Sequence, residues 1–360
     1  MPPLPDLPPA QSPADPDPAP FLEACGRRPV SRVPVWFMRQ AGRSLPEYRR
    51  ARRNESILDA VRVPALAAEL TMQPVRRYGV DAAILFSDIV VPLVAIGVDI
   101  DVVAGRGPVV EAPFRGPDDL ARLRPLEPDS DTPYVIETVE ILVKELSVPL
   151  IGFAGAPFTL ASYLIEGGPS RSFSKVKKLM LEEPGTFDRL LDRLADLSLA
   201  SLRSQVRSGA AAAQLFDSWA GILSPHHYER HVLPASAKVL SGLADLGVPR
   251  IHFGVGSGEL LGMMAAAGAD VVGVDWRTSL ADARERVGPA VAVQGNLDPA
   301  ACLAPWTAVQ AEVSRVLDDA GHLPGHVFNL GHGVLPETDP GILAEVVRMV
   351  HEAPPAPPRP

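Results

Sequence analysis

The chain has 360 residues, of which 46% are hydrophobic, and a formal net charge of −9 at pH 7. This length allows one large α/β barrel or two ordinary domains, and the apolar fraction is that of a globular core. The negative charge argues against general binding to nucleic acid or to an anionic membrane surface. The two cysteines, Cys25 and Cys302, lie far apart, so we expect no disulfide framework and a reducing, cytoplasmic environment.

Both ends of the chain are rich in proline. Residues 1–20 contain nine prolines and residues 353–360 contain five. Such segments hold too few large apolar side chains to form a core, so we predict a disordered tail at each end. The chain shows no signal-peptide pattern, and we expect a soluble, intracellular protein.

Between the tails, short apolar runs alternate with longer amphipathic stretches. The runs are largely apolar rather than alternating, as expected for strands that are buried on both faces of a parallel sheet. The eight runs are 34–38, 82–87, 148–153, 211–216, 250–254, 270–274, 290–294 and 326–330.

Helical spacing of apolar residues is clearest in four stretches, 54–77, 184–208, 225–245 and 299–320. Ser224 before Pro225 has the pattern of an N-cap followed by a first-turn proline. Strand–helix alternation repeated eight times predicts a single-domain (β/α)₈ TIM barrel over residues 21–352, with an insertion around 92–130. A doubly wound open sheet is the alternative, because periodicity cannot show whether a sheet closes.

In a barrel of this kind, functional residues gather where strands end at their carboxyl side. The first run ends in Arg39-Gln40-Ala41-Gly42-Arg43. Arginine binds a carboxylate through a planar, two-pronged contact. Two arginines four positions apart at a strand end therefore predict a site for a substrate with more than one carboxylate.

Four other polar side chains lie at or just beyond strand ends, namely Asp88, Tyr163, Ser218 and His332. An unpaired carboxylate at the end of an apolar strand costs free energy, so Asp88 is either functional, a helix cap or half of an ion pair. Tyr163 and His332 could instead be bonded to the backbone, and Ser218 could be a cap. The residue types alone leave these alternatives open.

No cofactor signature is present in the sequence. The metal-binding spacings H-x-C, C-x-x-C and H-E-x-x-H do not occur, and neither does the G-x-S-x-G nucleophile pattern. The five lysines all fall in helical stretches, so none is placed at a strand end to form a Schiff base. We therefore expect chemistry without a metal, a cofactor or a covalent intermediate.

Two long segments carry a resemblance to a known family. PVWFMRQAGRSLPEYR (34–49) and GFAGAPFTLASYLIEGG (152–168) resemble the signature segments of the uroporphyrinogen decarboxylase family. The shorter segments 84–89, 215–221, 294–299 and 329–336 are similar to that family in the same order. The resemblance covers residues 21–352.

The resemblance implies a cytoplasmic, cofactor-free (β/α)₈ barrel that forms a homodimer. It implies conversion of uroporphyrinogen III to coproporphyrinogen III in heme biosynthesis, with loss of four acetate carboxyls as CO₂. By motif, Arg39, Gln40 and Arg43 hold substrate carboxylates, Ala41 and Gly42 between them also bind substrate, and Asp88 binds the pyrrole N–H groups. Tyr163, Ser218 and His332 complete the pocket.

From these residues we expect Asp88 to stabilise a protonated pyrrole intermediate. Arg39 would anchor the departing carboxylate or relay a proton. Two other functions fit a barrel with these strand ends. One is a corrinoid- or thiol-dependent methyltransferase, which would need a zinc site. The other is a tetrapyrrole carrier, which would keep the arginines without needing Asp88.

Overall fold

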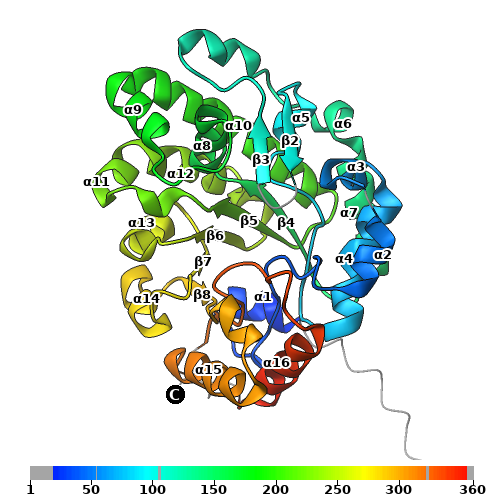
Figure 1. The fold of residues 1–360 in the computed structure, drawn as a ribbon. Coiled ribbons are helices and arrows are strands. Elements are labelled where there is room, and N and C mark those ends of the chain that lie inside the picture. Colours follow the sequence, from blue (N-terminus) through cyan, green and yellow to red (C-terminus); the bar gives the residue numbers. More distant parts are fainter. Residues whose placement is uncertain (1–18, 54, 104–106, 322–323, 355–360) are drawn as a thin grey trace, which may run out of the picture.

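The computed structural model describes residues 19–53, 55–103, 107–321 and 324–354 (Figure 1). The predicted tails, 1–20 and 353–360, lie almost wholly outside these residues. Within the described part of the chain, no helix combines the length and the hydropathy that a membrane span needs.

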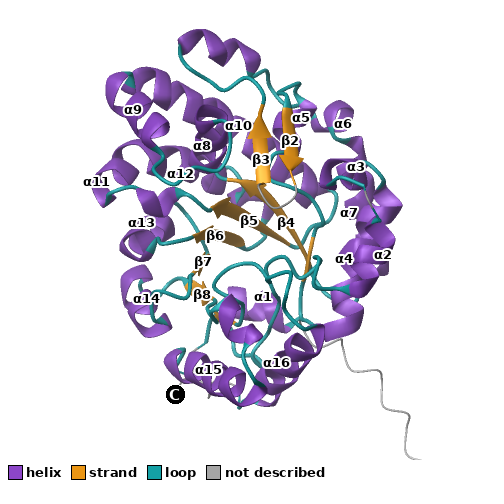
Figure 2. Cartoon of the chain, in the orientation of Figure 1, coloured by secondary structure: helices purple, strands orange, loops and turns teal. Residues whose placement is uncertain are grey.

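Seven parallel strands form the central sheet, and helices surround it (Figures 1 and 2). Neighbouring strands follow one another in the chain, except for the insertion between the first two. The register sets Ile151 against Ala212 and Val271 against Ala292. The strands are β1 (Ala83–Ile84), β4 (Leu150–Gly155), β5 (Ala212–Asp217), β6 (Arg250–Gly254), β7 (Val271–Gly273), β8 (Ala292–Gln294) and β9 (His326–Val327).

The segment before β1 closes the sheet into a barrel. Val35 forms an isolated parallel bridge with Phe328, next to β9. On its other side, the carbonyl of Val35 accepts the N–H of Asp81, just before β1, at 2.8 Å. The first predicted strand, 34–38, thus joins the two edges of the sheet, although only one residue of it pairs as a strand. The (β/α)₈ barrel is confirmed, and the open-sheet alternative is wrong.

The helices of the described residues are α1 (Pro20–Cys25), α2 (Pro46–Arg52), α3 (Ile57–Val61), α4 (Pro64–Tyr78), α5 (Val91–Ala95), α6 (Pro128–Asp131), α7 (Pro133–Glu145), α8 (Pro157–Glu166), α9 (Ser174–Glu182), α10 (Pro184–Arg207), α11 (Pro225–His227), α12 (Leu233–Ser241), α13 (Leu261–Ala266), α14 (Leu280–Val287), α15 (Trp306–Asp319) and α16 (Pro340–Glu352).

Three of the four predicted helical stretches are divided in the structure. The stretch 54–77 becomes α3 and α4, because Pro64 begins a new helix. The stretch 225–245 contains α11, a π-helical turn (Tyr228–Val232) and α12, and Pro234 lies where the π turn gives way to α12. A 3₁₀ helix (Pro299–Leu303) precedes α15. The predicted N-cap is confirmed, since Ser224 Oγ accepts the N–H of His227 at 3.3 Å.

A row of three buried side chains, linked by hydrogen bonds, joins the closing segment to two strands of the barrel. Trp36 Nε1 donates to Gln294 Oε1 at 2.9 Å, and Gln294 Nε2 donates to Gln214 Oε1 at 3.2 Å. All three side chains are buried. Because buried polar groups need partners, this row fixes the closing segment against β8 and β5.

The predicted insertion is a hairpin followed by short helices. Strands β2 (Ile100–Val103) and β3 (Gly107–Val110) pair antiparallel, and a 3₁₀ helix (Pro117–Arg122) follows. The insertion is hydrogen-bonded to the end of α8. Val110 N–H donates to Gly167 O (3.1 Å), and Phe114 N–H donates to Leu164 O (2.9 Å). It thereby steadies the helix that carries Tyr163.

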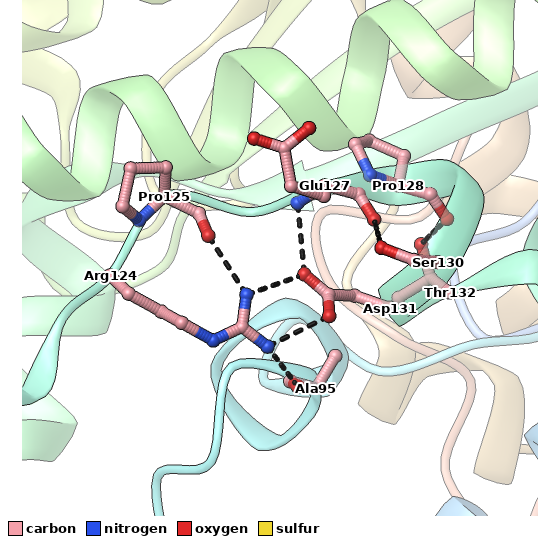
Figure 3. A network of polar contacts seen from close by, with 8 residues as sticks. All are labelled: Ala95, Arg124, Pro125, Glu127, Pro128, Ser130, Asp131 and Thr132. Atoms are coloured by element: carbon pink, nitrogen blue, oxygen red, sulfur yellow. Dashed lines mark hydrogen bonds and ion pairs between the residues drawn. The ribbon is translucent and has the colours of Figure 1, made fainter.

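A two-pronged ion pair between Arg124 and Asp131 lies farther along the insertion (Figure 3). Both terminal nitrogens of Arg124 lie 2.7 Å from the carboxylate of Asp131, at the end of α6. Arg124 also donates to the carbonyl of Ala95, at the end of α5. The contact joins α5 to α6.

Candidate active site

The turn after residue 38 places two arginines at the carboxyl end of the barrel. Its backbone is held by neighbouring side chains: Met38 N–H donates to Asn329 Oδ1 (3.0 Å) and Phe37 N–H donates to Gln40 Oε1 (3.1 Å). Arg39 has a positive φ of 59°. Non-glycine residues seldom adopt this conformation, so the surrounding contacts impose it.

The side chain of Gln40 is fully buried and bonded within the protein. Besides accepting from Phe37, its Nε2 donates to the carbonyl of Ala82 at 3.2 Å. These two bonds tie the arginine turn to the start of β1. The Gln40 amide therefore contributes by holding the turn in place.

Arg39 and Arg43 are both exposed. Among the described residues, neither guanidinium takes part in an ion pair. The stem of Arg39 lies against Gly333, where an added Cβ would be 2.4 Å from its Cδ. A glycine is needed there for the arginine stem to cross the turn that carries His332.

Asp88 lies just beyond β1 and is half-buried. Its Oδ1 accepts the N–H of Val90 at 3.1 Å, immediately before α5. Burial raises the pKa of Asp88 above its ordinary value, and the Val90 hydrogen bond and the nearby charge of Arg39 oppose that rise. The carboxylate thus caps the turn before α5 and also lies within the electrostatic reach of Arg39.

Tyr163 lies on α8 and is 8% exposed. Its ring packs edge-on against Trp219, with centroids 5.9 Å apart. Burial raises the pKa of the Tyr163 hydroxyl, the charge of Asp88 raises it further, and Arg39 lowers it. The hydroxyl therefore lies in the field of both charged groups.

His332 lies in the glycine-flanked turn after β9, with its ring 6.4 Å from that of Phe253. Burial and the charge of Arg39 lower the pKa of His332 to about 4, although Asp275 opposes the shift. The imidazole is therefore neutral at pH 7, and it can donate or accept one hydrogen bond without adding charge.

The structure brings Asp88, Tyr163 and His332 into the electrostatic reach of one group, Arg39. Ser218 follows β5 directly and is half-buried at the same end of the barrel. Ala41, Gly42 and Arg43 continue the Arg39 turn. No hydrogen bond or ion pair among the described residues joins Ser218 or Arg43 to Asp88.

Sequence reasoning missed a second charged group at the barrel mouth. Asp275, beyond β7, is 2% exposed, and its Oδ2 is paired with Nη1 of Arg277 at 2.6 Å. Asn296, beyond β8, donates from Nδ2 to the carbonyl of Asp275 at 2.9 Å. The signal was available, because Asp275 directly follows the run 270–274 and Asn296 lies two residues beyond the run 290–294.

Within the described ranges, no group of three or more His, Cys, Asp or Glu side chains is arranged to hold a metal ion. The expectation of chemistry without a metal or cofactor stays a prediction.

A closed parallel barrel with ionisable side chains at its carboxyl mouth defines the class of (β/α)₈-barrel proteins. Solved structures agree with this class. A methyltransferase from Methanosarcina mazei superposes with a TM-score of 0.76 at 21% identity, over 92% of this chain and 97% of that one. A B12-independent methionine synthase from Shewanella sp. W3-18-1 gives a TM-score of 0.54 at 13% identity, over 80% and 86%. At these identities the similarity shows the fold alone.

Sequence comparison gives the family. The profile described as "Uroporphyrinogen decarboxylase (URO-D)" matches residues 17–353. The uroporphyrinogen decarboxylase of Salinispora tropica is 60% identical over 94% of this chain and 92% of its own. That of Streptomyces griseus is 60% identical over 92% and 91%. The chain belongs to the uroporphyrinogen decarboxylase family, and it is an enzyme of the carboxy-lyase class.

Proposed function

We propose that this protein removes the four acetate carboxyls of uroporphyrinogen III as CO₂ and releases coproporphyrinogen III. The observation that carries the proposal is the placement at one barrel mouth of a half-buried carboxylate, Asp88, and the guanidinium of Arg39, which forms no ion pair with the described residues and whose charge acts on Asp88. Family membership supports the substrate, and this placement supports the roles of the residues.

The substrate has a charge layout that this site complements. Its macrocycle presents four N–H donors at the centre and eight carboxylates at the rim. An acceptor in the middle and cations around it match that layout, and Asp88 with Arg39 and Arg43 provides both. Each charge-assisted contact contributes about 1.5–3 kcal/mol to binding.

The chemistry needs an electron acceptor for each departing carboxylate. A proton added to the pyrrole carbon beside an acetate arm makes the ring cationic. The C–C bond then breaks, CO₂ leaves, and the electron pair enters the ring. A second proton converts the exocyclic methylene to methyl and the ring proton is lost, so each arm consumes one proton overall.

Asp88 suits the stabilisation of this cation. Burial penalises the ionised carboxylate, and that penalty is what raises its pKa. A cationic ring beside Asp88 relieves the penalty, and it does so only once the ring is protonated. An interaction that strengthens toward the transition state accelerates the reaction.

The neighbours of Asp88 have supporting roles. Arg39, exposed and free of ion pairs with the described residues, anchors the departing carboxylate. A guanidinium gives up a proton too reluctantly for acid catalysis, so a proton relay through Arg39 is the less favoured role. Tyr163 and neutral His332 supply hydrogen bonds, and Ser218 contributes a further donor at the same mouth.

Family membership also leads us to propose a cytoplasmic homodimer. Sedimentation equilibrium of the purified chain tests the dimer, with a monomer mass at all concentrations as the contrary result.

The decisive experiment is anaerobic incubation with uroporphyrinogen III and chromatographic separation of products by carboxyl number. We expect octacarboxylate to be converted through repeated turnover to tetracarboxylate. Stoichiometric binding without CO₂ release would instead indicate a tetrapyrrole carrier. Methyl transfer together with stoichiometric zinc in the purified protein would indicate a methyltransferase.

A further inference from the structure

Arg277 is a third arginine at the barrel mouth, four residues after the end of β7. Its Nη1 donates to Oδ2 of Asp275 at 2.6 Å, and its guanidinium carbon lies 4.0 Å from the ring centroid of Trp276. The Asp275 side chain is 2% exposed, whereas that of Arg277 is 52% exposed. One edge of the guanidinium is therefore fixed by a buried carboxylate and an indole face, while half of the side chain stays accessible.

Asp275 does not depend on Arg277 alone for its hydrogen bonds. Its Oδ2 also accepts the N–H of Gly256, and its Oδ1 accepts the backbone N–H of Arg277 at 3.1 Å. The buried carboxylate thus has backbone donors of its own. The ion pair consequently orients the guanidinium in addition to neutralising Asp275.

The turn that carries His332 lies between Arg277 and Arg39. A Cβ added to Gly331 would lie 2.4 Å from the backbone nitrogen of Trp276, so the turn is packed directly against the loop of Arg277. On the other side of His332, Gly333 is packed as closely against the Arg39 stem. The contacts therefore run without a break from one arginine loop, through the His332 turn, to the other arginine.

Electrostatics agree with this placement. After burial, the charges of Arg39 and Arg277 both lower the pKa of His332. The His332 ring therefore lies in the field of the two guanidiniums.

We propose that Arg277 binds a rim carboxylate of the substrate, on the side of the His332 turn opposite Arg39. Among the described residues, the guanidinium donates only to Asp275, through Nη1. Its remaining N–H donors are available for a two-pronged contact with a carboxylate. The inference rests on the proposed function, since a ring with carboxylates around its whole rim needs cations on more than one side. Arg277 lies in none of the segments that carry the family resemblance.

The test compares Arg277→Gln, Arg277→Lys and a control, Arg315→Gln. Arg315 lies on α15, is ion-paired with Glu312 and has a side chain 50% exposed, so it matches Arg277 in exposure and pairing. The measurements are kcat and KM for uroporphyrinogen III, the Kd for its fluorescent oxidised form, uroporphyrin III, and the melting temperature of each variant.

For Arg277→Gln we expect KM and Kd to rise about 10-fold, as for loss of one partly exposed charge-assisted contact, with kcat within about 2-fold. Arg277→Lys should lie between wild type and Arg277→Gln, and Arg315→Gln should match wild type. Unchanged KM and Kd in folded Arg277→Gln would overturn the inference. Should that variant fail to fold, Arg277→Lys decides by the same criterion.

Turnover of uroporphyrinogen III and the Kd for uroporphyrin III together distinguish a failure of this inference from a failure of the proposed function. If the wild-type protein binds uroporphyrin III without turning over uroporphyrinogen III, the proposed function fails, and the Kd series still tests Arg277. If the wild-type protein turns over normally and Arg277→Gln equals it in KM and Kd, only the role of Arg277 fails.

Discussion

Thr159, at the start of α8, donates from Oγ1 to Oδ1 of Asp217, at the end of β5, over 2.9 Å. Both residues have no exposed surface. The same Thr159 oxygen accepts the N–H of Trp219 at 3.2 Å. One hydroxyl therefore bonds one oxygen of a buried carboxylate and also fixes the loop that carries Ser218 and the indole against which Tyr163 packs.

Thr159→Val tests this arrangement. The variant keeps the side-chain shape but leaves Asp217 Oδ1 without its donor, so the free energy of unfolding should fall by about 1–3 kcal/mol. Urea denaturation at pH 7 measures it.

Thr138→Val is the matched control for that measurement. Thr138 is 1% exposed, and its hydroxyl donates to the helix carbonyl of Tyr134 instead of a carboxylate. Removing the Thr138 hydroxyl should lower the free energy of unfolding less than removing the Thr159 hydroxyl. If the free energy of unfolding fell equally in the two variants, the bond to the buried carboxylate of Asp217 would stabilise the fold no more than an ordinary hydroxyl–carbonyl bond.

The sequence was sufficient for the barrel but not for its closing segment. Residues 34–38 form an apolar run like the other seven, yet only Val35 pairs as a strand. Side chains distant in sequence accept the N–H groups of Val35 and Met38, namely those of Asp81 and Asn329. Periodicity reports which faces are buried, and it cannot show which side chain will replace a strand partner.

The site was predictable in part for a similar reason. Asp88, Tyr163 and His332 were predicted because each lies beyond an apolar run, and in the structure the charge of Arg39 acts on all three. Their roles stay predictions. Gln40 was predicted to help hold a substrate carboxylate, which stays a prediction, and its side-chain amide is bonded to Phe37 and Ala82. Such tertiary partners cannot be read from spacing.

Asp88→Asn tests the proposed cation stabilisation. Asn keeps the size and an acceptor for Val90 but removes the charge, so kcat should fall about 10²–10³-fold. Single-turnover CO₂ release measures the chemical step, and circular dichroism checks the fold. Asp101→Asn, an exposed change on β2, is the control and should be neutral. Near-normal kcat in folded Asp88→Asn would remove Asp88 from the mechanism.

Arg43→Lys tests the carboxylate contact on the exposed side of the arginine turn. Lysine keeps the charge but loses the two-pronged geometry, so KM should rise about 10-fold with little change in kcat. Steady-state kinetics at fixed ionic strength measures the effect. Arg50→Lys, exposed on the neighbouring helix α2, is the control. Equal KM values for the two variants would count against a binding role for Arg43.

We expect the contribution of Asp81 to the free energy of unfolding to depend on pH, because Asp81 holds the segment that closes the barrel. Its carboxylate accepts the N–H of Val35 (2.8 Å) and is paired with Arg32 (2.6 Å) and His351 (2.7 Å), on α16. Burial by itself would raise the pKa of Asp81, but the hydrogen bonds from His351, Val35 and Arg32 outweigh it, so the pKa is lowered. The folded protein therefore holds this carboxyl ionised to a lower pH than the unfolded chain does.

The sign of the pH effect follows from that lowered pKa. The unfolded chain binds more protons in the acid range, so the stability from Asp81 is fully present above its unfolded pKa, about 3.9, and is lost as pH falls through the lower folded value. Asp81→Asn should be less stable than wild type at pH 7, and the difference should shrink as the pH is lowered through this range. Urea unfolding from pH 7 to pH 3 measures it. A difference that stays constant across this range would show that Asp81 stabilises the closing segment as a neutral hydrogen-bond acceptor.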